Sequence, residues 1–387
     1  MVRPASISIV IPTYWGPATA ALYDHPTPVD GDSTLPQLLD SLAAQADAPE
    51  FSVFVLVSAV GAEWEEAATR RVSAILAPYA PRLHPYLVDA RTARLLVARL
   101  QPAGLDAQIS GMKGYAAVRN VQLLVPAALG AQVIIALDDD EVVRPDYVRT
   151  ATELIGAEHE GRKLVGIAGL YADAEGQVLL PEPAQTGNWL LDKAAFMNET
   201  LEGPLAASDR LSPTPMALGG NMVFHRELFA RIGFDPGITR GEDIDYLLNA
   251  RMAGFIFYLD RLLRITHLPP RHYESPPYGK MRQDVLRFVY EREKLRRGAL
   301  TPEALDPYPG RLLRDDLDDH ARGALAATAT PEMVAQLGAP DDILAEAQRR
   351  AQELVPRYFE FAERWPEMVE TLTKDDGLRE RLAQSAG

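Results

Sequence analysis

The chain has 387 residues and no cysteine, and its 54 Asp and Glu against 39 Lys and Arg give a formal net charge of −15. This length predicts two or three compact units, and the lack of cysteine excludes disulfides, a thiolate nucleophile, zinc–thiolate sites and iron–sulfur clusters. The acidic balance argues against a nucleic-acid partner, because phosphate binding needs clustered Lys and Arg.

The sequence also argues against membrane insertion. No stretch approaches the roughly 18 consecutive apolar residues that a transmembrane helix requires. The first residues carry one positive charge ahead of a short β-branched run, which is too short for the apolar region of a signal peptide. We therefore expect a cytoplasmic protein that has no transmembrane segment and begins with a β-strand.

Patterns typical of strands and of helices alternate in the first part of the chain. Residues 6–11 are rich in β-branched side chains and end at Pro12, which predicts a buried strand followed by a ligand-facing loop. The further elements predicted up to residue 137 are helices over 34–48, 63–79 and 115–129 and strands over 51–57, 83–88 and 132–137. This alternation indicates an α/β fold with an open, mainly parallel sheet, in which ligands bind beyond the carboxyl ends of the strands.

Two regions depart from this alternation. Pro, Gly, Asn and Ser interrupt it over residues 172–217, which predicts an irregular segment that shapes a pocket. Beyond residue 277 the strand patterns stop, and an apolar stripe at helical spacing predicts a helical C-terminal region. We expect a catalytic domain over 1–270 and a helical extension over 271–387, which is either a brace or homodimer surface or a lid over the acceptor.

Residues 271–300 hold eight basic residues against four acidic ones. One interpretation is a solvated helix face with ion pairs between residues four apart. The other is a grip on the phosphate or carboxylate of a ligand. The basic residues of this stretch are Arg271, Lys280, Arg282, Arg287, Arg292, Lys294, Arg296 and Arg297.

An acidic run follows the strand predicted over 132–137, which leads directly into Asp138, Asp139 and Asp140. Adjacent carboxylates repel one another unless a cation or a hydrogen-bond network compensates them. Oxygen ligands without thiolate favour Mg²⁺ or Mn²⁺, ions that usually bridge a protein to a diphosphate. The alternative is an acidic loop that caps the next helix.

A second group of motifs follows later in the chain. Two adjacent glycines allow a ligand to approach the backbone closely, and two carboxylates at the start of a predicted helix can accept a proton. A histidine after a strand-like run either ligates the same ion or keeps a hydrogen-bonded structural role. The residues of this group are Gly219, Gly220, Asn221, Glu242, Asp243 and His267.

Together these motifs resemble the inverting GT-A glycosyltransferases of the family-2 type, which transfer a sugar from a nucleotide diphosphate. The resemblance covers residues 5–270 and implies a GT-A fold, with a Rossmann-like, mainly parallel sheet and flanking helices. The motifs that carry it, in the order of that family, are Ile9-Val10-Ile11-Pro12-Thr13-Tyr14, Ala117-Val118-Arg119-Asn120, Leu137-Asp138-Asp139-Asp140, Gly219-Gly220-Asn221, Gly233-Phe234-Asp235, Gly241-Glu242-Asp243 and His267.

The resemblance implies a role for individual residues. Asp140, the last carboxylate of the family's DXD motif, would ligate Mn²⁺ or Mg²⁺ on the diphosphate together with His267. Asp243 would be the general base that deprotonates the acceptor hydroxyl, with Glu242 orienting it or the acceptor. The residues implied in binding the nucleotide sugar are Pro12, Thr13, Tyr14, Arg119, Asn120, Asp138, Asp139, Gly219, Gly220 and Asn221.

Two features depart from that family. Its second strand usually ends in an acidic pair that binds the base or the ribose, whereas here Ser58 offers only a hydroxyl in its place. The C-terminal part has neither membrane helices nor the QxxRW-type motif of processive polymerases. We therefore do not expect a processive membrane synthase.

These observations favour a metal-dependent glycosyltransferase of the hexosyltransferase type. It would use a UDP- or GDP-sugar, invert the anomeric centre and glycosylate a hydroxyl of a neutral or an anionic acceptor. Two alternatives stay open: a retaining transferase that makes a glyceric-acid or phosphoglycerate glycoside, and a non-catalytic nucleotide-sugar-binding module. A nucleotidyltransferase is disfavoured, because residues 12–16 do not form a Gly-rich, basic phosphate loop.

Overall fold

The computed structural model describes residues 6–17, 26–105, 111–181, 184–268 and 277–384. Within them lies a nine-stranded sheet of order β3-β2-β1-β4-β10-β8-β11-β5, in which β9 pairs with β11 outside this path. Its strands are β1 Ile7–Trp15, β2 Phe51–Ala59, β3 Tyr86–Val88, β4 Val133–Ala136, β5 Glu141–Val143, β8 Gly166–Ala172, β9 Leu211–Thr214, β10 Met222–His225 and β11 Phe257–His267. A separate hairpin joins β6 Glu158–His159 to β7 Arg162–Lys163.

The sheet is mainly parallel, as expected. Strands β1 to β4 are parallel to one another, and β10 runs antiparallel to both β4 and β8. Strand β11 is parallel to β8, whereas β5 and β9 run antiparallel to β11. The carboxyl ends of β1, β4 and β11 therefore meet at one edge of the sheet, which is where such sheets bind ligands.

Both faces of the sheet are buried, because side chains alternate along each strand. On β1, Val10 joins one core with helices from the C-terminal half of the chain and the helix at 115–129, whereas Ile9 and Ile11 join a second core with the helices at 35–43, 62–76 and 147–153. The strand was expected to end at Pro12 but continues to Trp15. The carbonyl of Val10 accepts a hydrogen bond from the N–H of Leu137, just past the end of β4. Pro12, two residues further on, faces the same side of β1, where β4 no longer runs beside it. The missing N–H of Pro12 therefore breaks no hydrogen bond of the sheet.

Most predicted helices are present, and α5 has the predicted bounds. The sequence patterns did not predict α3, α4, α6, α7 and α8. Helix α7 lies in the stretch 172–217, so the prediction that this stretch is irregular was wrong in part. The helices are α1 Leu35–Ala43, α2 Ala62–Leu76, α3 Ala80–Leu83, α4 Ala90–Leu100, α5 Tyr115–Leu129, α6 Tyr147–Glu153, α7 Lys193–Ala206, α8 Arg226–Phe229, α9 Glu242–Met252, α10 Pro277–Gly298, α11 Leu317–Thr328, α12 Pro331–Leu337, α13 Pro340–Thr373 and α14 Asp376–Gln384.

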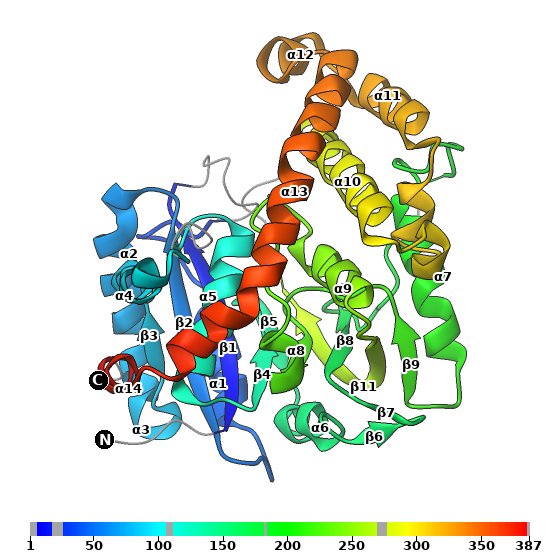
Figure 1. The fold of residues 1–387 in the computed structure, drawn as a ribbon. Coiled ribbons are helices and arrows are strands. Elements are labelled where there is room, and N and C mark those ends of the chain that lie inside the picture. The colour runs from blue at the N-terminus through cyan, green and yellow to red at the C-terminus, as the bar shows by residue number, and fades with distance from the viewer. Residues whose placement is uncertain (1–5, 18–25, 106–110, 182–183, 269–276, 385–387) are drawn as a thin grey trace.

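The helical C-terminal region is confirmed, and it is packed against the sheet domain. Figure 1 shows α13 running from the group formed by α10, α11 and α12 across to α5 and α14. Its Trp365 is fully buried, lies against Gly233 and donates an indole hydrogen bond to Phe229 O at 2.8 Å. The boundary at residue 270 and the homodimer stay predictions. No helix among the described residues is long and apolar enough to span a bilayer.

Candidate functional site

A cavity of about 340 Å³ opens at the edge where β1, β4 and β11 end. The N-terminal ends of α5 and α9 border it, so segments that are distant in sequence meet there. Nine of the residues predicted for the site line this cavity: Tyr14, Arg119, Asp138, Asp139, Asp140, Gly219, Glu242, Asp243 and His267.

The acidic run lies just beyond the end of β4. Arg119, on α5, donates from Nη2 to Asp138 Oδ1 at 2.7 Å and from Nε to Glu242 Oε1 at 3.4 Å. Burial, and next to it the charge of Asp140, raise the pKa of Asp139 to about 8, although the nearby Thr13 hydroxyl opposes the shift. Arg119 therefore pairs with one carboxylate of the run, and the next one, Asp139, is ionised less readily than an exposed carboxylate.

Asp140 lies in the turn between β4 and β5, and it faces His267 at the end of β11. His267 Nε2 lies 3.3 Å from Asp140 Oδ2, and the backbone N–H of Leu268 donates to Asp140 O. Burial acts to lower the pKa of His267, but its hydrogen bond to Asp140 and the charge of that carboxylate raise it overall. The pair presents one imidazole and one carboxylate to the cavity, both of which are ligands for divalent ions.

Glu242 and Asp243 occupy the first turn of α9, and Gly241 precedes them in the left-handed conformation (φ 72°). Burial, followed by repulsion from Asp243, raises the pKa of Glu242 to about 7 against the opposing effect of Arg119. Burial also raises the pKa of Asp243, while the N–H of Ile244 and the cations Arg287 and Arg119 lower it. Asp243 therefore lines the cavity and has a raised pKa, which makes it a stronger base than an exposed aspartate.

The remaining predicted residues do not line the cavity. Asn120 is 1% exposed, and its amide makes two hydrogen bonds of 2.8 Å with the backbone of Phe234. Asn221 accepts from Tyr147 and donates to Leu170 O, and the Ser58 hydroxyl donates to Met112 O at 2.6 Å. The polar groups of these three side chains form hydrogen bonds within the protein, and none of the three lines the cavity, so their expected nucleotide contacts stay a prediction. Pro12 and Thr13 are likewise buried inside β1.

The two glycines have different surroundings. A Cβ at Gly219 would lie 2.7 Å from Arg119 Nη2, so this glycine leaves room for the guanidinium. A Cβ at Gly220 would lie 1.9 Å from Glu141 Oε1. Gly220 therefore makes space for Glu141, a buried carboxyl, and donates its N–H to Tyr171 Oη at 2.6 Å.

The structure adds a cationic wall that the sequence did not identify as part of this site. It consists of Lys193 on α7, Arg240 before α9 and Arg287 on α10, and all three line the cavity. The carboxylate of Asp284 and the hydroxyl of Tyr308 lie among them. The apolar neighbours of Arg287, namely Leu286, Phe288 and Val289, were the one sequence signal that it is not a surface residue.

The rest of the basic stretch is mostly paired within the protein. Arg282 donates to Glu346, and Arg292 contacts Asp318 at 2.8 Å. Lys294 is fully buried and forms ion pairs with Asp235, at 2.7 Å, and with Asp245. Arg271 lies outside the described residues.

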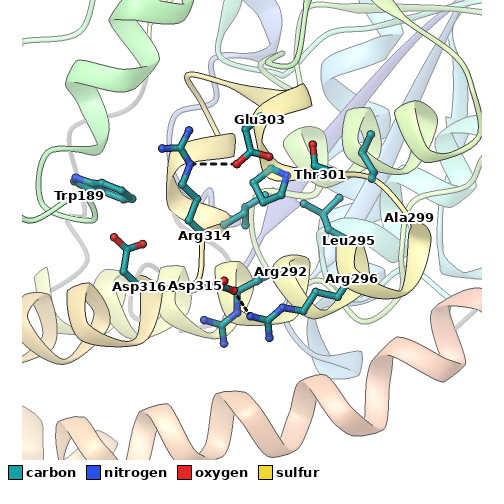
Figure 2. Close-up of a pocket in the computed structure, with 13 residues that line it drawn as sticks. Trp189, Arg292, Leu295, Arg296, Ala299, Thr301, Glu303, Arg314, Asp315 and Asp316 are labelled. Atoms are coloured by element: carbon teal, nitrogen blue, oxygen red, sulfur yellow. Dashed lines mark hydrogen bonds and ion pairs between the residues drawn. The ribbon is translucent and has the colours of Figure 1, made fainter.

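A second cavity, of about 770 Å³, lies beside the C-terminal end of α10 (Figure 2). Several of its charged side chains are paired with each other, since Arg314 lies 3.9 Å from Glu303 and Arg296 donates to Asp315 at 2.6 Å (Figure 2). Two of its lining residues, Arg292 and Arg296, belong to the basic stretch, but the described residues that line it include none of those predicted for catalysis, for the metal or for the nucleotide sugar. We therefore place the functional site in the smaller cavity.

No family model and no curated protein matches this chain. Among solved structures, it is similar to the mannosyltransferase PcManGT from Pyrobaculum calidifontis in complex with GDP-Man and Mn²⁺, with a TM-score of 0.46 and 16% identity, over 96% of this chain and 87% of that one. A mycobacterial protein has a TM-score of 0.39 and 16% identity, over 76% of this chain and 75% of its own. GalNAc-T7 with UDP, GalNAc and Mn²⁺ has a TM-score of 0.39 and 14% identity, over 88% of this chain and 58% of its own.

Proposed function

We propose that this chain is a metal-dependent glycosyltransferase of the GT-A, family-2 type, which moves a sugar from a nucleoside-diphosphate donor to an acceptor hydroxyl. One observation carries the proposal: Asp140, His267 and Asp243 come from three segments that are distant in sequence and line a single cavity at the carboxyl edge of the sheet. A ligand pair for a divalent ion and a candidate base are thus brought together, as sugar transfer from a diphosphate requires.

The donor set fits Mn²⁺ or Mg²⁺. Carboxylate and imidazole suit these ions. Burial, and next to it the charge of Asp140, raise the pKa of Asp139 to about 8, and a bound cation would favour its ionised form. No group of three or more His, Asp and Glu among the described residues is arranged to enclose an ion. Asp140 and His267 would therefore hold it with diphosphate oxygens and water as the other ligands, and its charge would stabilise the leaving diphosphate.

The chain's own residues account for the rest of the reaction. Asp243 takes the proton of the acceptor hydroxyl as its oxygen forms a bond to the anomeric carbon. The bond from that carbon to the diphosphate oxygen breaks, and the diphosphate leaves with the electron pair. Because one base activates the acceptor directly, the anomeric centre is inverted. Glu242 and Asp138 both accept hydrogen bonds from Arg119, which fixes the position of this guanidinium in the cavity that Asp243 also lines.

We assign the nucleoside to the end of the cavity where Tyr14 and Tyr115 meet edge to face, with ring centroids 5.2 Å apart. UDP and GDP are the expected nucleotides. The aromatic pair offers apolar surface for a base, while Asp138 and Gly219 line the same cavity. Asn120, Asn221 and Ser58 have no place in this assignment, because the protein itself uses their polar groups.

The test is a transfer assay with Asp243→Asn. UDP- and GDP-sugars are supplied with Mn²⁺, release of the nucleoside diphosphate is followed, and the anomeric configuration of the product is read by NMR. We expect the variant to lower kcat about a hundredfold or more, as loss of a general base does. Mn²⁺-dependent donor binding should persist.

Asp319→Asn is the matched control, since Asp319 is a highly exposed carboxylate on α11. It should leave kcat unchanged. Undiminished transfer by Asp243→Asn, or a product with retained configuration, would contradict the assigned base.

A further inference from the structure

One buried carboxyl behind the cavity has no role in the proposed reaction. Glu141 is the first residue of β5 and follows the acidic run directly. It is 1% exposed and does not line the cavity. A carboxyl loses its hydration on burial, which is costly unless its oxygens find partners in the protein. The groups around Glu141 therefore indicate what this carboxyl does.

The backbone of Glu141 lies between the two residues of the candidate metal pair. Glu141 is next to Asp140 in the chain, and the antiparallel pairing of β5 with β11 places it opposite His267. The N–H of Leu268 donates to Asp140 O at 2.8 Å, which continues this pairing past His267. A displacement of Glu141 would therefore move the backbone on both sides of the pair.

The side chain of Glu141 closes the turn that carries the acidic run. Its Oε2 accepts from the N–H of Asp138 at 3.0 Å, so the carboxyl bonds back to the residue where the run begins. The side chain of Asp138 is held separately, by the hydrogen bond from Arg119 at 2.7 Å. Asp140 lies inside this closed turn. The carboxyl of Glu141 thus fixes the backbone that presents Asp140 to the cavity.

Tyr171, on β8, extends this support to His267. Its hydroxyl accepts from the N–H of Gly220 at 2.6 Å. A Cβ at Gly220 would lie 2.5 Å from this hydroxyl and 1.9 Å from Glu141 Oε1, so the hydroxyl and the carboxyl are neighbours. The ring of Tyr171 packs against the imidazole of His267, with ring centroids 5.4 Å apart. Glu141 and Tyr171 together therefore support both halves of the metal pair.

We propose that Glu141 is a positioning residue, which together with Tyr171 holds Asp140 and His267 in the arrangement that binds the divalent ion. The inference rests on the proposed function, since it assigns the support of the same metal pair. Residues that orient metal ligands contribute to metal affinity without contacting the ion, and their loss typically weakens it about ten- to a hundredfold. Glu141 acts through a hydrogen bond from a backbone N–H, for which one side-chain oxygen is sufficient.

The experiment measures the dissociation constant of Mn²⁺ by electron paramagnetic resonance, with UDP or GDP present, whichever tightens Mn²⁺ binding to the wild type. Glu141→Leu removes both oxygens, so the N–H of Asp138 loses its acceptor. We expect this variant to raise the dissociation constant about tenfold or more. Glu141→Gln keeps an oxygen that can accept from Asp138, and we expect it to stay within about threefold of the wild type.

A second readout needs no metal. Hydrogen exchange of the metal-free protein, followed by mass spectrometry, reports how firmly the backbone of residues 137–143 is held. Exchange in this segment should be faster in Glu141→Leu than in the wild type or in Glu141→Gln.

Tyr171→Phe tests the other half of the support and decides the matter if Glu141→Leu does not fold. It removes only the hydroxyl, so the N–H of Gly220 loses its acceptor while the ring against His267 remains. We expect the dissociation constant of Mn²⁺ to rise about threefold or more.

Asp260→Asn is the matched control for a loss of stability. Asp260 is also 1% exposed and accepts from a backbone N–H, that of Leu262 at 3.0 Å, but it lies toward the other end of β11 from His267. The variant weakens the ion pair of Asp260 with Arg210. It should therefore be less stable than the wild type, yet bind Mn²⁺ with the same dissociation constant.

Three results would overturn the proposal. The first is wild-type affinity for Mn²⁺ in Glu141→Leu, or in Tyr171→Phe where Glu141→Leu does not fold. The second is an equal loss in Asp260→Asn, because lower stability would then explain the effect. The third is a Glu141→Gln variant as weak as Glu141→Leu, which would assign the effect to charge. Failure of the proposed function is a separate result, in which the wild type itself binds no Mn²⁺ with either nucleotide, and it would overturn both proposals.

Discussion

Two groups of buried carboxylates in this molecule differ in what neutralises them. Under α10, Asp235 and Asp245 share the ammonium of Lys294, and the Tyr290 hydroxyl donates to Asp235 at 2.7 Å. At the edge of the sheet, Asp138 and Glu242 share the guanidinium of Arg119, and Asp140 lies 3.3 Å from His267. Full pairing inside the protein indicates a structural role. A surplus of charge facing a cavity indicates that a ligand completes the site.

The largest stability effect should come from the compensated group. Lys294→Met removes the one cation that Asp235 and Asp245 share, leaving two fully buried carboxylates unpaired. We expect a loss of about 3–5 kcal/mol in the free energy of unfolding, measured by urea denaturation. Lys280→Met on the same helix is the control. A loss below about 1 kcal/mol would show that this cluster is not a brace between α9 and α10.

Asn120 offers a smaller test of the same distinction, because the resemblance assigns it to the nucleotide whereas its hydrogen bonds go to Phe234. Asn120→Ala leaves both backbone groups of Phe234 without that partner. It should cost about 2 kcal/mol of unfolding free energy but leave the dissociation constant of the donor within about twofold. Gln132→Ala, at an exposed amide, is the control. Weakened donor binding at unchanged stability would return Asn120 to the site.

These cases show what the sequence could predict. Local periodicity located β1, β2, β4 and α5, because each is an apolar segment with a clear repeat and a turn residue at its end. The acidic run, Asp243 and His267 were found because each stands where a strand ends or a helix begins, and such positions share one edge of a parallel sheet.

The remaining features depend on contacts between distant segments. Lys193, Arg240 and Arg287 meet only because α7, α10 and the segment before α9 border the same cavity, and no short motif encodes that arrangement. Lys294 looks like another member of a basic surface stretch, yet it is fully buried by partners at Asp235 and Asp245. A motif also does not distinguish a ligand contact from a buried hydrogen bond, and the hydrogen bonds of Asn120 with Phe234 could not be read from the sequence.

The smallest effect concerns Glu291, between the two groups. Burial raises its pKa to about 8, above its ordinary value, so the folded state binds its proton more tightly than the unfolded chain does. Its contribution to stability is complete below the unfolded pKa and is lost as the pH rises toward 8. The wild type should therefore lose free energy of unfolding as the pH rises from about 6 to about 8. In Glu291→Gln this loss should be smaller by about 1 kcal/mol. Identical pH profiles would show that Arg287 keeps Glu291 ionised.

The most direct measurement is the affinity for Mn²⁺, which electron paramagnetic resonance reports. It is measured with and without UDP or GDP for the wild type, for Asp140→Asn and for the exposed control Asp319→Asn. We predict that one nucleoside diphosphate tightens Mn²⁺ binding to the wild type and to the control, and that Asp140→Asn loses this effect. Equal Mn²⁺ affinity with and without either nucleotide, or an unchanged response in Asp140→Asn, would contradict the claim that the carboxylates of the acidic run bind a metal together with a diphosphate.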